Sequence, residues 1–486
     1  MATTAVVIPI ANGRVHSTQS PTVAQAYDTN QTKWTATFSA SAEQRLHFSW
    51  HVPGNYLSGN LTVKLRWRTT ATSGDVVWKA YYIFKQDGGT SAASNTTTGT
   101  TTASGSAGVI YETSLTLSTG IGANRLLLFT IGRDAAAGGD TCANTAELLD
   151  IIMEYTSDPT ITKAYFWVPV NAGAIPSASS STVTLGGVAT STHFSSTGDE
   201  LQPYVLTMVD SPSATADFKV SLPANYNGSP TISLWMNPKS TSQSSIVFSA
   251  ASGAVGSARD PSLTSGGGTH SVTGSASTTN LDLQRSFTTV TPSASDELVL
   301  RMKRDNTDAS AVPIEVIGFQ FEFNVNASYP VTVRMDPGAA VVPASNPASL
   351  TQSNDTNASR WVMRHADGST TSGDYLAAIY STYTSGGTLR VRWSSSASSG
   401  NGRFRVDYGS PATSSSADPA LTSGTAFDTA TSGANLINEW TFDVSSGLVA
   451  GDNLNVRIVR EGGHANDTLG ASVDILEVVL EHYATL

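Results

Sequence analysis

Several segments of the chain alternate between apolar and polar residues with a period of two. The clearest of these runs are residues 61–67, 298–303, 388–393 and 454–458. Because successive side chains of a strand point to opposite faces, this alternation predicts strands with one buried face. Few segments show the 3.6-residue period of an amphipathic helix, so we expect little helix.

The strand pattern occurs three times along the chain. The block that ends in Trp67 recurs in a form that ends in Trp235 and again in a form that ends in Trp393, at spacings of 168 and 158 residues. A second landmark, the sequence Asp-Pro-x-Leu-Thr-Ser-Gly, begins at Asp260 and again at Asp418, also 158 residues apart. A repeat of this length is typical of a domain.

We therefore predict an all-β protein of three tandem antiparallel β-sandwich domains with a short N-terminal arm. A jelly roll fits better than an immunoglobulin fold, because each copy exceeds the roughly 100 residues of an immunoglobulin domain. The predicted parts are the arm at residues 1–19, a first repeat at 20–157, a divergent second repeat at 158–328 and a third repeat at 329–486. The junctions at Asp158-Pro159 and Tyr329-Pro330 have no Gly/Ser linker, so we expect a semi-rigid rod.

The N-terminal arm contains an apolar segment outside the predicted repeat. Its residues are Val6, Val7, Ile8, Pro9 and Ile10. An exposed β-prone segment normally pairs with another strand. It adds a strand either to its own first domain or to a neighbouring subunit or capsid surface, so these five are the candidate partner-binding residues.

Composition supports a folded, weakly charged β protein. Asp, Glu, Lys and Arg make up 13% of the residues, against about 25% in an average globular domain. About a quarter of the residues are Ser or Thr, so hydroxyl groups cover much of the expected surface. The 39% of hydrophobic residues is too many for a disordered chain.

Charge and cysteine content limit the partners and the compartment. The net charge is −11 and no cluster of Lys and Arg is visible, so we expect no nucleic-acid partner. The single cysteine, Cys142, excludes an intramolecular disulfide and favours folding in a reducing cytoplasm. The N-terminal segment lacks the basic region of a signal peptide, and no apolar run is long enough for a membrane insertion.

No common catalytic signature is present in the sequence. It contains no G-x-S-x-G, P-loop, dinucleotide fingerprint or H-E-x-x-H motif, and its eight histidines are scattered. We therefore predict a protein that is not an enzyme and has no cofactor. Four aromatic residues could form a sugar-stacking platform if they are not in the core: Trp50, Trp78, Tyr81 and Tyr82.

An arginine followed seven residues later by Asp-Thr is the strongest local motif. It occurs as Arg133 with Asp140 and Thr141, and as Arg460 with Asp467 and Thr468. In the functional interpretation, this loop recognises a partner or binds Ca²⁺ through Asp134, Asp140 and Asn144, since hard cations prefer clustered oxygens. In the structural interpretation, which we favour, Asp and Thr cap backbone N–H groups and the arginine pairs with a neighbour.

Three features of the sequence form a recognisable pattern: V-P-x-N-Y-x-x-G-x-L-x-V-x-L-x-W over residues 52–67, the R-D…D-T loop, and the acidic-aromatic endings at Glu154-Tyr155 and at Glu481 with Tyr483. This pattern resembles the tandem β-sandwich modules of structural proteins on tailed-bacteriophage particles. It extends over the chain as three copies, although the second lacks the D-T loop. It implies a non-enzymatic virion component such as a head decoration protein, a head fibre or a tail fibre.

Our first functional hypothesis is a capsid decoration or cement protein that projects from the virion surface after assembly in the host cytoplasm. Its partners would be capsid or other virion proteins, and the protein would be a homo-oligomer, with a trimer as one candidate. The alternative is a tail or head fibre that binds a receptor or cell-surface glycan. A glycan hydrolase remains a third hypothesis, because a carboxylate pair assembled by folding is not visible in sequence.

Overall fold

The structure of the chain is a computed structural model. It describes residues 2–28, 32–86, 93–158, 160, 163–187, 201–211, 213–222, 226–228, 230–237, 243–253, 257, 259, 263, 269–273, 283–288, 297–308, 311–325, 331–335, 337–355, 359–379, 383–410 and 420–484. Of the first Asp-Pro-x-Leu-Thr-Ser-Gly landmark only Leu263 is among these residues, whereas residues 420–424 of the second landmark are described.

The first domain consists of two antiparallel sheets. In order across the first sheet, the strands are β3 (Thr22–Tyr27), β4 (Thr32–Phe38), β11 (Ala146–Ser157), β6 (Tyr56–Thr69) and β9 (Tyr111–Leu117), and β1 (Ala2–Ile8) also pairs with β11. The second sheet has the order β2 (Arg14–Val15), β5 (Gln44–His51), β10 (Leu126–Arg133), β7 (Asp75–Lys85) and β8 (Asn95–Thr102).

The second domain repeats this strand order. Its first sheet contains β13 (Val183–Gly187), β14 (Tyr204–Met208), β21 (Ile314–Asn324), β16 (Thr231–Asn237) and β19 (Leu283–Thr288), and β12 (Lys163–Pro169) also pairs with β21. Its second sheet contains β15 (Thr215–Ser221), β20 (Glu297–Arg304), β17 (Gln243–Gly253) and β18 (Thr269–Thr273).

The third domain has the same arrangement. Its first sheet contains β23 (Ser349–Asn354), β24 (Ser359–His365), β32 (Val473–Ala484), β26 (Tyr383–Ser395) and β30 (Asn438–Asp443), and β22 (Val331–Met335) also pairs with β32. Its second sheet contains β25 (Thr370–Ala378), β31 (Asn453–Glu461), β27 (Asn401–Gly409) and β28 (Thr422–Ser423), and β29 (Phe427–Ala430) pairs with β27.

The helical elements of the described residues are short 3₁₀ turns: η1 (Ile10–Asn12), η2 (Val170–Ala172), η3 (Ser177–Ser179), η6 (Pro337–Ala339) and η7 (Ser445–Gly447). In the part of the chain that the structure describes, no helix is long and apolar enough to cross a membrane. The prediction of tandem antiparallel β-sandwich domains is therefore confirmed.

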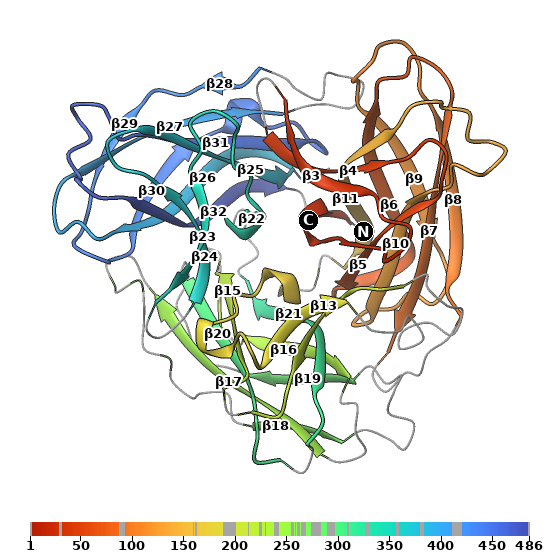
Figure 1. Ribbon diagram of the computed structural model, residues 1–486, viewed down its shortest axis with the longest axis horizontal. Coiled ribbons are helices and arrows are strands. Elements are labelled where there is room, and N and C mark those ends of the chain that lie inside the picture. Colours follow the sequence, from red (N-terminus) through yellow and green to blue (C-terminus); the bar gives the residue numbers. More distant parts are fainter. Residues whose placement is uncertain are drawn as a thin grey trace.

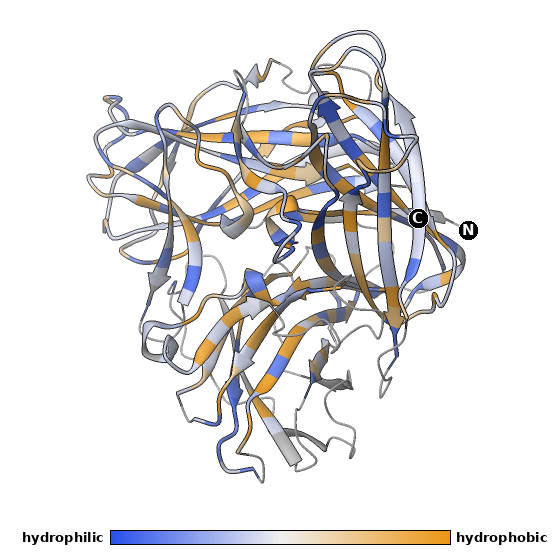
Figure 2. Cartoon of the chain, turned by 45° about the vertical axis from the view of Figure 1, so that its right-hand side comes forward, coloured by the Kyte–Doolittle hydropathy of each residue, from blue (hydrophilic) through white to orange (hydrophobic). Residues whose placement is uncertain are grey.

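Each domain has its own apolar core between its two sheets. Trp67 and Trp78 belong to the first core, Phe319 to the second, and Trp393 to the third. Figure 2 shows how apolar and polar residues alternate along many of the strands. This period-two pattern places one face of each sheet in the core.

The N-terminal segment, which the sequence analysis placed outside the repeat, is the first strand of the first domain. β1 pairs with β11 as β12 pairs with β21 and β22 with β32. The sequence carries a signal for this equivalence, since Ile-Pro-Ile at residues 8–10 corresponds to Val-Pro-Val at residues 168–170. A glycine follows three residues after each motif, at Gly13 and Gly173. At both positions an added Cβ would lie 2.6 Å from a core side chain.

The alignment of Trp235 with the other two marker tryptophans is wrong by one residue. In all three domains the pairing with the neighbouring long strand contains a β-bulge at the same place. Trp67 and Trp393 follow this bulge, whereas Trp235 precedes it. Met236 takes the core position in the second domain. A shift of one residue moves a side chain to the other face of a sheet, so Trp235 points out of its own domain.

The three domains form a closed ring, not the rod that we expected (Figure 1). Strand β5 contacts β12, β14 and β21 of the second domain, β15 contacts β24 of the third, and β25 contacts β1 and β4 of the first. The strands β5, β15 and β25 occupy equivalent places, so the second sheet of each domain packs on the first sheet of the next. The resulting arrangement is pseudo-threefold.

Candidate functional site

A buried ion pair holds the Arg133 loop inside the first domain. The Arg133 guanidinium is fully buried and donates to both carboxylate oxygens of Asp140, at 2.9 and 2.7 Å. It also donates to the carbonyl oxygen of Asn144 at 2.6 Å, and Asp140 accepts the backbone N–H of Val77 at 3.0 Å. We call this arrangement of arginine, carboxylate and backbone N–H the Arg–Asp clamp.

The third domain contains the same clamp. Arg460 donates to Asp467 at 3.0 and 2.9 Å, and Asp467 accepts the backbone N–H of Arg403 at 3.1 Å. The threonine that follows each aspartate also accepts a backbone N–H group. Thr141 Oγ1 accepts the N–H of Asp75 at 2.8 Å, and Thr468 Oγ1 accepts the N–H of Asn401 at 3.0 Å. These contacts support the structural interpretation of the loops.

The second domain has a clamp that sequence reasoning missed. Arg304 is fully buried and pairs with Asp308, which also accepts the backbone N–H of Ser245. The carboxylate lies four residues after the arginine instead of seven, so a search for the spacing seen in the other copies does not find it. The shared feature is the arginine at the end of β10, β20 and β31, not the loop length.

The Ca²⁺ hypothesis does not fit the geometry of these side chains. Both oxygens of Asp140 face the Arg133 guanidinium, which occupies the place of a cation. Asp134 lies 3.5 Å from the ammonium group of Lys79, and the Asn144 side chain donates to Thr70. Among the described residues, no group of three or more His, Cys, Asp or Glu is arranged to hold a metal ion.

The candidate partner-binding and sugar-binding residues are largely inside the first domain. Ile8 and Ile10 are buried in its core, while Val6, Val7 and Pro9 are partly buried along β1 and the turn after it. The segment thus adds a strand to its own domain, which was the first of the two alternatives. The sugar-platform candidates Trp50, Trp78, Tyr81 and Tyr82 are all buried.

The contact between the first and second domains is mainly apolar. Trp235 and Trp167 pack in it with Ile83, Leu126, Leu128, Leu201, Val205 and Ile317. His51 lies against both indoles, with ring centroids 6.1 Å from Trp167 and 5.9 Å from Trp235. Gly318 lies beneath Trp167, where an added Cβ would come within 2.3 Å of the ring. Glycine is therefore required for the tryptophan to pack against this strand.

The contact between the second and third domains is ionic. Arg259 donates to Asp355 and Asp474, both at 2.7 Å. Asp217 accepts the backbone N–H of Ser359 across the contact at 2.7 Å and is itself held by Arg301. Burial favours the neutral form of Asp474, but hydrogen bonds from Arg364 and Arg259 hold the pKa of its carboxyl below the usual value.

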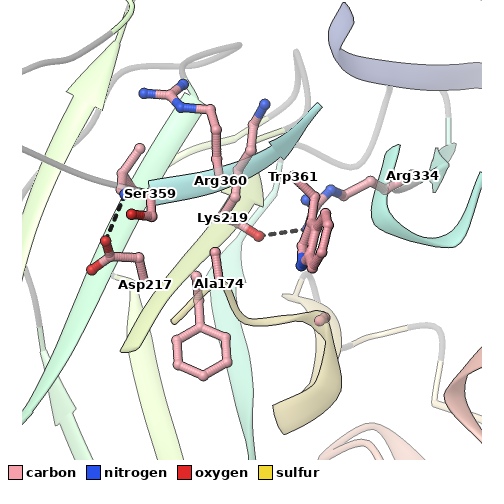
Figure 3. A pocket seen from close by; sticks show the side chains of 10 residues that line it. Ala174, Asp217, Lys219, Arg334, Ser359, Arg360 and Trp361 are labelled. Atoms are coloured by element: carbon pink, nitrogen blue, oxygen red, sulfur yellow. Dashed lines mark hydrogen bonds between the residues drawn. The ribbon is translucent and has the colours of Figure 1, made fainter. Parts of the chain in front are cut away.

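A small cavity lies at this same contact (Figure 3). Six of its lining residues are Asp217, Lys219, Arg334, Ser359, Arg360 and Trp361. Lys219 donates to the carbonyl of Leu476 in the third domain, and Arg334 donates to the carbonyl of Lys219 at 2.5 Å. The interior has room for about one water molecule, so these cationic side chains join two domains instead of surrounding a ligand.

The contact between the third and first domains is polar. Arg66 donates to the carbonyl of Gly451 and to Asp452 at 3.3 Å, and Asn453 donates to the carboxylate of Asp150. Burial raises the pKa of the Asp150 carboxyl, although the charges of Arg66 and Lys33 oppose this shift. The folded ring therefore disfavours ionisation of Asp150 relative to an exposed carboxyl group.

Comparisons with known proteins reveal only structural likeness. No family model and no curated protein matches the chain. Solved structures with a similar arrangement include the tandem CBM22 domains of Paenibacillus barcinonensis Xyn10C, with 12% identity over 67% of this chain and 99% of that chain and a TM-score of 0.22. A triple jelly-roll protein of an archaeal virus matches with 11% identity over 97% of this chain and 90% of that chain, with a TM-score of 0.18. The likeness is confined to the tandem jelly-roll architecture.

The Arg–Asp clamp of the third domain predicts a large loss of stability in Asp467→Asn. The substitution removes the buried carboxylate that Arg460 holds with two hydrogen bonds and leaves it only the half-exposed Asp367 as a counter-charge, which costs up to about 3–5 kcal/mol of unfolding free energy at pH 7. Urea denaturation followed by circular dichroism measures this loss. The matched control is Asp428→Asn, which removes an ion pair at the surface of the same domain and should have little effect.

The clamp also determines how the difference in stability between wild type and Asp467→Asn depends on pH. Burial favours the neutral form of Asp467, but hydrogen bonds from Arg460 hold its pKa below the usual value. A carboxyl with a lowered pKa stabilises the fold above about pH 4 and loses that contribution as the pH falls through its folded pKa. The gap between wild type and Asp467→Asn should therefore narrow in acid. Equal stability of the two proteins at pH 7 would contradict the clamp.

Asp150→Asn is expected to act in the opposite direction. Because the pKa of Asp150 is raised, ionisation at pH 7 costs folding free energy, and this cost disappears below about pH 4. In the variant, Arg66 still has the carboxylate of Glu112 as a partner, and Lys33 still has that of Asp28. The variant should thus be more stable than wild type at pH 7, and the gain should vanish at pH 3.5. Denaturation curves at both pH values test this, and a variant less stable at pH 7 would refute it.

Proposed function

We propose that the chain is a non-enzymatic structural protein of a virus particle, exposed at the particle surface as a capsid decoration protein. The observation that carries this proposal is the closed ring of three similar domains. Each domain presents its second sheet to the first sheet of the next, so one chain has the arrangement that a trimer of single domains would have. The domains are fixed in their relative positions by contacts on both sides.

This arrangement suits a threefold position on a symmetric shell. Oligomeric assemblies usually have closed point-group symmetry, and surfaces around a threefold axis repeat three times. A ring with pseudo-threefold symmetry matches such a position with a single chain. Its partners in this proposal are capsid proteins, and the three domains meet equivalent sites while differing in their own surface residues.

The chemistry of the chain also fits a particle that is assembled inside a cell and then exposed outside it. The one cysteine, Cys142, is buried in the first core, so the protein carries no accessible thiol there to oxidise. Threonines line the exposed face of β8, at Thr96, Thr98, Thr100 and Thr102, without a charged residue in that strand. The fold depends on no disulfide and tolerates either redox environment.

The proposal is tested by locating the chain on particles. Antibody against the recombinant protein is applied to virus particles purified from cells that produce it, and the particles are viewed by electron microscopy. We expect label over the capsid surface, with one three-lobed density at each occupied threefold or local threefold position after image reconstruction. Label confined to the tail, or absence of the chain from purified particles by mass spectrometry, would overturn the proposal. Antibody to an internal virion protein is the matched control.

A further inference from the structure

The contact between the first and second domains contains a titratable group, His51, which lies against two indoles and is hydrogen-bonded to the side chain of Gln320. His51 is 1% exposed and its imidazole is stacked on Trp167 and lies against Trp235. Both indoles come from the second domain, whereas His51 ends strand β5 of the first. A proton on this ring would place a charge between two tryptophans and away from water, which is unfavourable.

We propose that this contact is an acid-sensitive latch: protonation of His51 in mildly acid solution separates the first domain from the second, while the other two contacts of the ring hold. The proposal rests on the position of the imidazole at a domain boundary. When the two domains part, the ring of His51 reaches water without any change inside either sandwich.

The titration behaviour of His51 supports the latch. Burial lowers its pKa to about 3 in the closed ring, against an ordinary value of 6.5. Below pH 6.5 the open form therefore binds a proton that the closed form rejects, and opening becomes more favourable as the pH falls. With these two values, the opening equilibrium increases about 30-fold between pH 7.5 and pH 5.

Other titratable and charged groups face this contact from the surrounding elements. The first domain contributes Arg14, Lys85 and His47, whose ring lies against His16, and the second contributes Tyr204 and Glu315, while Arg45 donates to Tyr81 within the first domain. Lys85 and His51 flank Leu126 on neighbouring strands. His47 Nδ1 accepts the backbone N–H of Gln202 at 3.3 Å and lies 2.6 Å from Thr130 Oγ1, so in this tautomer the threonine hydroxyl donates to it.

The other two contacts respond differently to acid, so the ring opens at a defined place. Burial raises the pKa of Asp150 and Asp452 between the third and first domains, so protonating them favours the closed contact. The lowered pKa of Asp474 keeps the contact between the second and third domains intact until about pH 4. His365 and His482 lie within the third domain, and their protonation would loosen that domain instead of the latch.

Native-state thiol labelling of the full chain measures opening directly. Val205→Cys places a thiol of similar size in the apolar contact, where it is buried. Its labelling rate, divided by that of a free thiol at the same pH, gives the opening equilibrium. We expect this ratio to rise about 30-fold from pH 7.5 to pH 5. Cys142, in the core of the first domain, is the internal control, and its protection should not follow the latch.

The decisive comparison adds His51→Phe, which keeps an aromatic ring and removes the titration. The rise of the Val205→Cys ratio should then disappear while its value at pH 7.5 changes little. His51→Gln serves the same purpose if the phenylalanine variant does not fold. An equal rise with and without His51, or no rise in the chain that retains it, would overturn the proposal. A parallel rise at Cys142 would also overturn it, because it would indicate unfolding of the first domain.

Discussion

The packing of one sheet against the next domain is the constraint on which the rest of the structure depends. Each sandwich buries its inner faces in its own core, but each also covers the outer face of its second sheet with the first sheet of a neighbour. Three such contacts made head to tail bring the third domain back to the first. A covered outer face cannot be hydroxyl-rich and solvated like an exposed one, so the outward positions of β5, β15 and β25 carry residues that suit a partner domain.

Two equivalent positions on the outward side of the first sheet differ in chemistry among the three domains. The outward position of the long central strand is Arg66 in the first domain, Trp235 in the second and Arg392 in the third. The residue opposite it is Asp150, Gly318 or Glu477. An arginine faces a carboxylate in two domains, while in the second a tryptophan faces a glycine that leaves room for Trp167. Because mismatched contacts would bury unpaired charge against indole, these differences favour one order of domains around the ring.

The sequence predicted the strands, the threefold repetition and the internal pairing of Arg133 and Arg460, because period-two alternation and repeated loops are local signals. It did not predict the register of Trp235, since a one-residue shift at a β-bulge leaves the composition of the strand unchanged. The clamp of Arg304 was missed because its aspartate comes from a loop of different length. The ring was missed because contacts between domains depend on outward-facing residues whose partners lie more than a hundred residues away. The repeated Ile-Pro-Ile and Val-Pro-Val motifs, by contrast, were available and would have placed the N-terminal segment inside the first domain.

Small-angle X-ray scattering of the purified chain tests the closed ring most directly. A compact chain of 486 residues has a radius of gyration of about 23 Å. Three separate sandwiches in a line, each with a radius of gyration of about 15 Å and spaced by about 40 Å, would give about 36 Å. The ring predicts a value near 23–25 Å at neutral pH and a distance distribution with one maximum. A value above about 30 Å, with the long tail of an extended particle, would contradict it.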